Sequence, residues 1–421
     1  MWVRPRAGGV PADLGFATDA DLPQLPASKS HAQRMVLLAG MLDGEREIVG
    51  VGDSLDVRHA LRAAAALGAE VLGHEDAVVV RGLPWRERPP RGVVACGENA
   101  TLLRTLGTLV PALGGALELQ ADAGLQRRPH QPLFDTWRAM GIVHRSSWPL
   151  ATASPRVLPA LPRGVDASLT TQVATGLVLA LALRGGGALV VERPGSRDYL
   201  QVTARVLRDF GFEVTLRAVG EDLHVAVDGS ATSKRKLVVP RDPSARAFVC
   251  SLAALHALPV PAVLRSLGAL EHPDHGIDAD LERLLGAGTV ELSGLAARPD
   301  SVPALAVAAA ARVGVTRMPH LAALRTKESD RLAQLEQGLR ACGARCSVVG
   351  NGLVVEGPPR SPAGPVHVDC APDHRIVMAL ALLGTVLPHG IRLPNADCVA
   401  KSWPSFWAWL GRVAHVAREP G

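Results

Sequence analysis

The sequence predicts an α/β protein of two domains that is built from six βαβ-like units. A chain of 421 residues is too long for one simple core and suggests two domains of roughly 200 residues each. An amphipathic Leu/Ala stretch, a glycine and an alternating β-type stretch recur along it, beginning at Leu61, Phe134, Ala204, Leu281, Leu335 and Phe406. These starts lie too far apart for a short-repeat solenoid. Three units in each domain is the natural division.

Each unit combines a helical pattern with a strand pattern. After the glycine the apolar period changes from about 3.6 to 2, which indicates a helix, a glycine C-cap and then a pair of strands. A second helix precedes each of these, over residues 30–42, 101–113, 171–183, 245–256, 301–311 and 374–383. We expect one domain to span residues 1–24 and 240–421 and the other residues 25–239. A single large α/β sheet would leave the sixfold recurrence unexplained.

The composition is that of a soluble globular protein, with 48% hydrophobic and 20% charged residues. The net charge of +5 is spread along the chain without a basic stripe interleaved with aromatics, so we expect no nucleic-acid polymer as partner. The most apolar run, residues 173–183, is too short to cross a bilayer, and we expect no membrane association. Six scattered cysteines form no zinc pattern and indicate reduced thiols in the cytoplasm.

The first charged motif is LPASKSHAQRMVLLAG, which places Lys29 and Arg34 at the start of a predicted helix. Ser28 or Ser30 can cap that helix, and the free N–H groups of a helix start attract anions. Taken alone, such a motif is more often a helix cap with solvated charges.

A second motif, ALRTKESDRLAQLEQGL, crowds charges into what we expect to be the first turns of a helix: Arg325, Lys327, Glu328, Asp330 and Arg331. A solvated ion-pair face explains some of them. It does not explain basic residues at a helix start, where they oppose the helix dipole. Anion binding resolves that conflict.

Further basic residues follow the same pattern. They are Arg127 and Arg128 in QRRPH, His374 and Arg375 beside Asp373 in APDHRIVMALALLG, and Lys401 in ADCVAKSWPSF. An arginine at the end of a buried helix needs a partner, and a phosphate or carboxylate is suitable. Together these clusters predict a site for a multiply charged anion.

The chain resembles the 5-enolpyruvylshikimate-3-phosphate synthase (EPSP synthase) family of enolpyruvyl transferases. The resemblance is carried from about residue 25 to residue 407 by LPASKSHAQR, GENATLLR, RRPH, TTQ, GSRDY, RPDS, RTKESDR, DHR and CVAKSW. It implies a two-domain inside-out α/β barrel (the EPT/RTPC-like fold) with six βαβαββ repeats, three per domain, that closes over substrate. It implies neither metal nor organic cofactor, and we expect a cytoplasmic monomer.

The resemblance implies transfer of the enolpyruvyl group of phosphoenolpyruvate to the 5-hydroxyl of shikimate 3-phosphate, with release of phosphate through a tetrahedral intermediate. This step belongs to the shikimate pathway of aromatic amino acid biosynthesis. Asp300 is then the general base, and Glu328, with Lys29 close by, protonates the methylene carbon. The implied phosphoenolpyruvate-binding residues are Lys29, Ala100, Arg128, Gln172, Arg331, Arg375 and Lys401. The implied acceptor-binding residues are Ser30, Arg34, Thr170, Thr171, Gln172, Ser196, Tyr199, Asp300 and Lys327.

Several positions depart from the family pattern: Leu55, Glu98, Ala100, Ala323, and Thr170 and Thr171 in place of two serines. Ala100 replaces a glycine beside phosphoenolpyruvate, which suggests poor sensitivity to the family's inhibitor glyphosate. Glu98 brings a negative charge to an anion site. Leu55, Glu98 and Ala323 leave open another phosphorylated acceptor such as a nucleotide, and an inactive anion-binding homologue is a further alternative. A UDP-N-acetylglucosamine enolpyruvyl transferase is set aside because ADAGLQRRPH lacks that family's cysteine.

Overall fold

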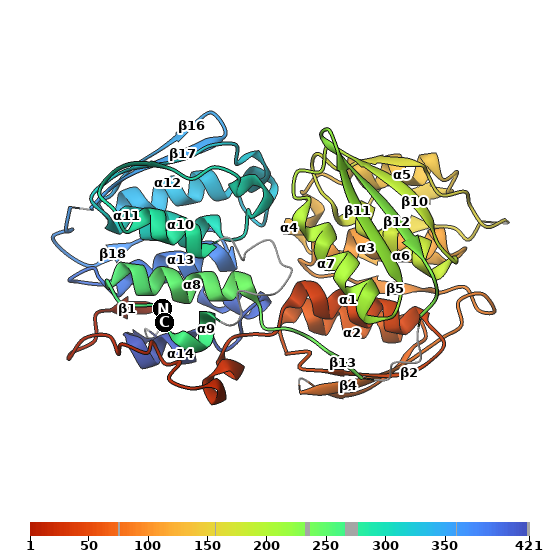
Figure 1. Cartoon of the computed structure of the whole chain (residues 1–421), viewed down its shortest axis with the longest axis horizontal. Coiled ribbons are helices and arrows are strands. Elements are labelled where there is room, and N and C mark those ends of the chain that lie inside the picture. The colour runs from red at the N-terminus through yellow and green to blue at the C-terminus, as the bar shows by residue number, and fades with distance from the viewer. Residues whose placement is uncertain (75, 156, 232–235, 266–276, 359, 419–421) are drawn as a thin grey trace. The chain divides into compact units, whose positions relative to one another are not determined.

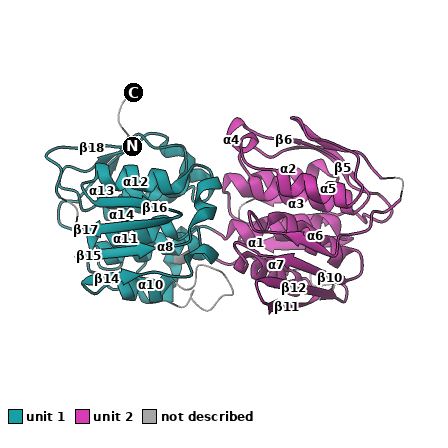
Figure 2. Cartoon of the chain, turned by 90° about the horizontal axis from the view of Figure 1, so that it is seen from above, with its two compact units in different colours: residues 1–26, 241–421 teal, residues 27–240 magenta. Residues whose placement is uncertain are grey.

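The computed structural model describes residues 1–74, 76–155, 157–231, 236–265, 277–358 and 360–418 (Figure 1). The chain divides into two compact units (Figure 2). Unit 1 comprises Met1–Pro26 and Arg241–Gly421, and unit 2 comprises Ala27–Pro240. The chain therefore leaves unit 1 after a short N-terminal segment and returns to it for its C-terminal half.

Unit 2 contains helices and strands in regular alternation. Its helices are α1 (Lys29–Met41), α2 (Leu55–Ala66), α3 (Ala100–Ala112), α4 (Ala123–Gln126), α5 (Gln131–Ala139), α6 (Gln172–Leu183) and α7 (Asp198–Asp209). Its strands are β2 (Gly44–Val49), β3 (Glu70–His74), β4 (Ala77–Gly82), β5 (Arg91–Ala95), β6 (Ala116–Gln120), β7 (His144–Arg145), β8 (Leu150–Thr152), β9 (Gly164–Asp166), β10 (Gly187–Glu192), β11 (Glu213–Val219), β12 (Asp222–Asp228) and β13 (Lys236–Val238). They form four-stranded sheets in the orders β13-β2-β4-β3, β5-β6-β8-β7 and β11-β12-β10-β9.

The helices of unit 2 lie inside and the sheets outside. Helices α1, α3 and α6 are buried on almost every side. The sequence of α6 is apolar all round, whereas α1 also buries the polar side chains of His31, Gln33 and Arg34. Strand β12 instead alternates buried and exposed residues, as expected for a sheet with one face in water. Gly176 lets α6 approach α3 closely, since a Cβ there would lie 2.7 Å from the carbonyl oxygen of Thr105. In Figure 2, β10, β11 and β12 lie beside α6 and α7 at the outside of the unit.

Unit 1 has the same organisation. Its helices are α8 (Pro243–Leu255), α9 (Ala262–Arg265), α10 (Ile277–Leu284), α11 (Val302–Ala311), α12 (Arg331–Ala341), α13 (His374–Gly384) and α14 (Phe406–Val413), with the 3-10 helices η1 (Asp19–Gln24), η4 (Leu295–Ala297), η5 (Ala322–Thr326) and η6 (Ala396–Lys401). Its strands are β1 (Trp2–Arg4), β14 (Gly288–Glu291), β15 (Gly314–Met318), β16 (Arg345–Val349), β17 (Gly352–Gly357), β18 (Val366–His367), β19 (Ile391–Arg392) and β20 (His415–Ala417). Helices α8, α11 and α13 pack together as its buried centre.

The sheets of unit 1 run in the orders β14-β15-β17-β16 and β18-β19-β1-β20. The N-terminal strand β1 pairs antiparallel with β19 and with β20, so the first residues of the chain complete a sheet of C-terminal strands.

The predicted fold class is confirmed. The six helices predicted to come first in each unit are α1, α3, α6, α8, α11 and α13, and their ends lie within two residues of the prediction. Each of these helices pairs with a later one: α1 with α2, α3 with α5, α6 with α7, α8 with α10, α11 with α12 and α13 with α14. Five of the six pairs carry a four-stranded sheet. The remaining pair, α8 and α10, has no such sheet within the described residues, and residues 266–276 between them lie outside that part. Among the helices of the described residues, none is both long enough and apolar enough to span a membrane.

One helix prediction is wrong. The charges of RTKESDR do not fill the first turns of a helix, because α12 begins only at Arg331. The Asp330 side chain accepts a hydrogen bond from the backbone N–H of Ala333 at 3.2 Å and caps the helix there. Lys327 and Glu328 therefore lie in the segment between η5 and α12.

Candidate active site

Three carboxylates and four basic side chains meet near helix starts of unit 1. We call this set the unit 1 cluster, and its members are Asp300, Lys327, Glu328, Arg331, Asp373, Arg375 and Lys401. Asp373 is the N-cap residue of α13, Arg331 begins α12 and Lys401 ends η6. The cluster carries one positive charge in excess, which suits an anionic ligand.

Arg331 lies at the centre of the unit 1 cluster, with 1% of its side chain exposed. Its Nη1 donates to Asp300 Oδ1 at 2.9 Å, its Nη2 to Glu328 Oε2 at 2.7 Å and its Nε to Asp373 Oδ2 at 2.8 Å. Burial acts to lower its pKa, but the carboxylates of Asp373, Glu328 and Asp300 together raise the pKa of this guanidinium above its ordinary value. Because the guanidinium is planar and rigid, it fixes the spacing of the three carboxylates.

Asp300 contacts three cations. Its Oδ1 lies 2.9 Å from Arg331 Nη1 and 3.5 Å from Lys327 Nζ, and its Oδ2 lies 3.1 Å from Arg375 Nη2. Arg375 also donates to Ser244 Oγ at 2.9 Å, at the start of α8. The partner expected for the arginine of the DHR motif is therefore, within unit 1, a carboxylate of the chain itself.

Glu328 contacts two cations through different oxygens. Oε2 accepts from Arg331, and Oε1 lies 3.2 Å from Lys401 Nζ. Burial is the main cause that lowers the pKa of the neighbouring Lys327, and the charge of Asp300 opposes it. Arg331 thus separates the carboxylates of Asp300 and Glu328, and each of them has further cation neighbours of its own.

In unit 2, Lys29 is held by a carboxylate that lies on the next helix. Its Nζ lies 2.7 Å from Asp56 Oδ2, and both side chains are largely buried. The Asn99 amide nitrogen donates to the backbone oxygen of Asp56 and to Gln33 Oε1, each at 2.9 Å. Its oxygen accepts from the backbone N–H of Leu102 at 3.0 Å and caps α3. Asn99 therefore joins α1, α2 and α3 where Lys29 is placed.

A second set in unit 2 surrounds Gln172 at the start of α6. Its Oε1 accepts from Arg104 Nη1 at 2.7 Å, and its Nε2 donates to Thr101 Oγ1 at 2.9 Å. Arg104 also donates to the backbone oxygen of Pro129 at 2.9 Å, next to Arg128. The side chains of Arg104 and Thr101 thus fix the orientation of the Gln172 amide group.

Arg34 is almost fully buried among the helices of unit 2. Its nitrogens donate to Thr203 Oγ1 at 2.9 Å, to the backbone oxygen of Ser30 at 2.7 Å and to Thr175 Oγ1 at 3.4 Å. Burial lowers its pKa to about 10, and the charge of Tyr199 acts in the opposite direction. In this arrangement Arg34 ties α1 to α6 and α7.

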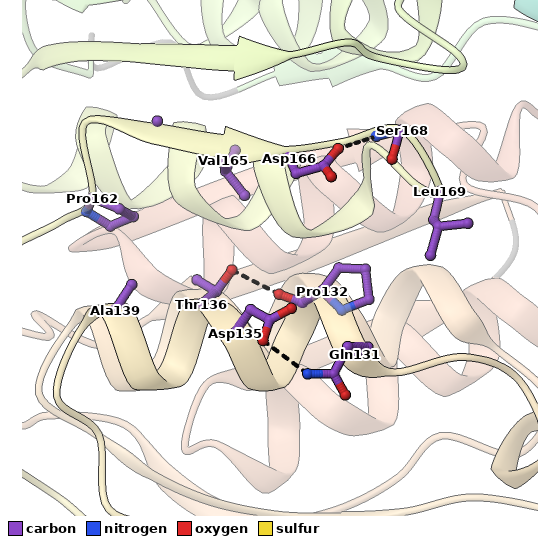
Figure 3. A pocket seen from close by; sticks show the side chains of 11 residues that line it. Gln131, Pro132, Asp135, Thr136, Ala139, Pro162, Val165, Asp166, Ser168 and Leu169 are labelled. Carbon is purple, nitrogen blue, oxygen red and sulfur yellow. Dashed lines mark hydrogen bonds between the residues drawn. The ribbon is translucent and has the colours of Figure 1, made fainter.

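A cavity of unit 2 lies away from these side chains. It has a volume of about 330 Å³ between α5 and the segment from β9 to Leu169, and it includes none of the predicted site residues (Figure 3). Its polar groups are bonded to one another: Thr136 Oγ1 donates to the Pro132 oxygen at 2.8 Å, and Asp166 accepts from the Ser168 N–H at 2.9 Å. We assign it no part in the site. Among the described residues, no group of three or more His, Cys, Asp or Glu side chains could hold a metal ion.

Comparison with known proteins identifies the family. A family model described as EPSP synthase (3-phosphoshikimate 1-carboxyvinyltransferase) matches residues 19–261 and 281–410. The chain belongs to the EPSP synthase family. The resemblance predicted from the motifs is thereby confirmed, and the chain is a transferase of this family.

Curated relatives and solved structures agree with the family. The chain is 33% identical to the 3-phosphoshikimate 1-carboxyvinyltransferase of Anaeromyxobacter sp. (strain K), over 94% of each chain. It is 32% identical to that of Methylorubrum extorquens, over 90% of this chain and 91% of the relative. EPSP synthase from Acinetobacter baumannii shares the fold, with a TM-score of 0.71 and 23% identity over 92% and 94% of the chains. The enolpyruvyl transferase NikO from Streptomyces tendae also shares the fold, with a TM-score of 0.65 and 18% identity over 92% of this chain and 93% of that chain.

The residues predicted from the EPSP synthase resemblance divide between the units. Unit 1 contains Asp300, Lys327, Glu328, Arg331, Arg375 and Lys401, all within the unit 1 cluster. Unit 2 contains Lys29, Ser30, Arg34, Ala100, Arg128, Thr170, Thr171, Gln172, Ser196 and Tyr199. There Thr170 Oγ1 accepts from the Gln172 N–H at 3.2 Å, and the Ser196 oxygen accepts from the Tyr199 N–H at 3.1 Å.

The sequence prediction missed several residues that hydrogen-bond or pair with the predicted site residues. They are Gln33, Asp56, Asn99, Arg104 and Ser244, together with Asp373, which was named only as the neighbour of His374 and Arg375. Their position could have indicated them, because they lie within the first two turns of helices or just before them. Polar residues are common there as ordinary helix caps, so the position alone does not indicate a site. Their partners lie 27 to 131 residues away, so the pairs could not be read locally.

Proposed function

We propose that this chain transfers the enolpyruvyl group of phosphoenolpyruvate to the 5-hydroxyl of shikimate 3-phosphate and releases phosphate. Membership of the EPSP synthase family supports this activity, and the relatives compared above carry the matching name. The observation that carries the proposal is the Arg331 guanidinium, which holds Asp300 and Glu328 in different cation environments. Addition followed by elimination needs a base and an acid with distinct tasks.

The addition step uses Asp300 as base and Glu328 as acid. The acceptor hydroxyl oxygen bonds to the central carbon of phosphoenolpyruvate while its proton passes to Asp300. Glu328 enters this step in its protonated form. It gives that proton to the methylene carbon, with Lys29 in support, and the carbon becomes a methyl group. The product is a tetrahedral ketal phosphate.

Elimination reverses the proton transfers. The bond from the central carbon to the phosphate oxygen breaks, the methyl group returns a proton to Glu328, and Asp300 gives up its proton to the departing phosphate. Basic side chains stabilise the negative charge on the leaving group. Arg331 already makes four carboxylate hydrogen bonds with its five N–H groups, which leaves one N–H of Nη1 without a bond to a described residue.

The proposed binding roles divide between the units. From unit 2, Lys29, Ala100, Arg128 and Gln172 contribute to phosphoenolpyruvate binding, and Arg331, Arg375 and Lys401 contribute from unit 1. The acceptor is bound by Ser30, Arg34, Thr170, Thr171, Gln172, Ser196 and Tyr199 of unit 2 and by Asp300 and Lys327 of unit 1. We propose that the two units are the two domains of the enzyme. We also place it in the cytoplasm as a monomer, and its six free thiols support a reducing compartment.

The test is a phosphate-release assay with phosphoenolpyruvate and shikimate 3-phosphate, run beside a panel of phosphorylated alcohols and nucleotides. Lys29→Met and Asp300→Ala should abolish turnover, and Glu328→Gln should lower kcat by about 10²- to 10⁴-fold. The matched controls are Lys236→Met and Glu291→Gln, because both side chains are exposed on strands, and they should retain wild-type rates. Turnover with a nucleotide alone, or ligand binding with no turnover, would contradict the proposal and favour the corresponding alternative.

A further inference from the structure

Glu98 brings a negative charge to a place where an anionic substrate is expected. It lies in the turn between β5 and α3, and its Oε2 is 3.9 Å from Arg128 Nη2. We infer that Glu98 is an affinity-determining residue that competes with anionic ligands for Arg128. This inference rests on the proposed function for the identity of the ligand, but its electrostatic part applies to any phosphate or carboxylate.

The backbone around Glu98 is fixed against the segment that carries Arg128. The Cys96 N–H donates to the Gln120 oxygen at 2.8 Å, and the Asp122 N–H donates to the Gly97 oxygen at 3.0 Å. The Asn99 N–H closes the turn onto the Cys96 oxygen at 2.9 Å. The carboxylate of Glu98 is thus presented toward α4 and Arg128 by ordered main chain.

The chain leaves room for this carboxylate at Gly124. A Cβ atom built on Gly124 would lie 2.5 Å from Glu98 Oε1 and 2.6 Å from Oε2. A side chain at position 124 would therefore displace the Glu98 carboxylate from its present place near Arg128. Gly124 is not among the residues with a left-handed backbone, so alanine fits its conformation and the substitution tests only the space.

The two members of the pair differ in exposure. The Arg128 side chain is 9% exposed, whereas that of Glu98 is 37% exposed. A buried guanidinium is costly without a counter-charge, and Glu98 supplies one while no substrate is bound. An incoming phosphate or carboxylate has to displace Glu98 from Arg128 or bind beside it against charge repulsion. Both routes weaken binding of the anion.

Kinetics with the full chain test the inference. Glu98→Gln should lower the KM for phosphoenolpyruvate by about three- to tenfold, with the KM for the acceptor unchanged. Gly124→Ala should shift the same KM in the same direction while the carboxylate is retained. Glu118→Gln is the matched control, because Glu118 lies on the adjacent strand β6 and pairs at 3.3 Å with the exposed Arg145. It should leave both KM values unchanged.

Calorimetric binding of inorganic phosphate separates this inference from the proposed function. Glu98→Gln should bind phosphate about three- to tenfold more tightly than wild type, and the gain should vanish when it is combined with Arg128→Met. If this holds but the wild type transfers no enolpyruvyl group, the proposed function fails and the inference stands. A KM that rises in Glu98→Gln, or an unchanged phosphate affinity, would overturn the inference.

Discussion

The Arg331 guanidinium and the Asp373 carboxylate form a two-point pair in which both side chains are almost completely buried. Nε lies 2.8 Å from Oδ2, and Nη2 lies 3.2 Å from Oδ1. The same carboxylate accepts from Ser329 Oγ at 3.0 Å and from the Arg375 N–H at 3.0 Å. Asp373 therefore fixes the starts of α12 and α13, and with them the two arginines of the unit 1 cluster.

Replacement of Asp373 by Asn should cost stability and activity together. The buried Arg331 would lose the negative charge of Asp373, and breaking a buried ion pair in this way lowers the free energy of unfolding by about 3 kcal/mol. Urea unfolding should show this decrease, and kcat should fall because Arg331 no longer holds Asp300 and Glu328 in place. Asp369→Asn is the control, since Asp369 is exposed and close in sequence. Equal stability of the two variants would show that the pair contributes nothing.

Asp56 should act as a positioning residue for Lys29. Asp56→Asn removes the negative charge 2.7 Å from the ammonium group, so we expect kcat to fall about tenfold or more and the pH profile of kcat to change. Asp53→Asn is a matched control, because it breaks a more exposed pair with Arg58 at the preceding turn. If Asp56→Asn altered only thermal stability, with kcat and its pH profile unchanged, this would contradict a positioning role for Asp56.

Ala100 should determine the response to glyphosate. It is the first residue of α3 and is 6% exposed, beside the Asn99 cap and Thr101. Ala100→Gly removes one methyl group, so we expect inhibition by glyphosate to strengthen about tenfold or more, in line with the hypothesis that the methyl group narrows the pocket. Ala123→Gly, at the exposed start of α4, is the control. A wild-type inhibition curve that matches that of Ala100→Gly would rule the hypothesis out.

His130 should make stability depend on pH. Burial is the main cause that lowers its pKa from 6.5 to about 4, and the charges of Arg104 and Arg128 add to this. The unfolded chain then binds more protons than the folded one between about pH 6.5 and pH 4, so stability falls as the pH drops through that window. From pH 7 to pH 5 the loss should be about 1–2 kcal/mol larger in wild type than in His130→Gln.

Urea unfolding at several pH values measures this difference. His74→Gln is the control, since His74 is exposed on β3, and it should keep the wild-type dependence on pH. Parallel stability curves for wild type and His130→Gln would contradict the prediction.

Local patterns were sufficient for the helices. Helices such as α6 and α11 are apolar all round, and this property is visible in any window of the sequence, so their positions could be predicted to within two residues. The start of α12 was misplaced because one hydrogen bond sets it, from the backbone N–H of Ala333 to the Asp330 side chain. A run of mixed charges does not show which of its acidic residues is the cap.

The sequence by itself determined the repeated helices, the fold class and the basic residues near the helix starts, because period, composition and motif order are properties of neighbouring residues. Only the tertiary structure decided which charges neutralise one another. Lys29 pairs with Asp56, Arg331 with Asp373 and Glu98 with Arg128. The physical reason is that an ion pair depends on distance in space, and packing of helices from remote parts of the chain sets that distance.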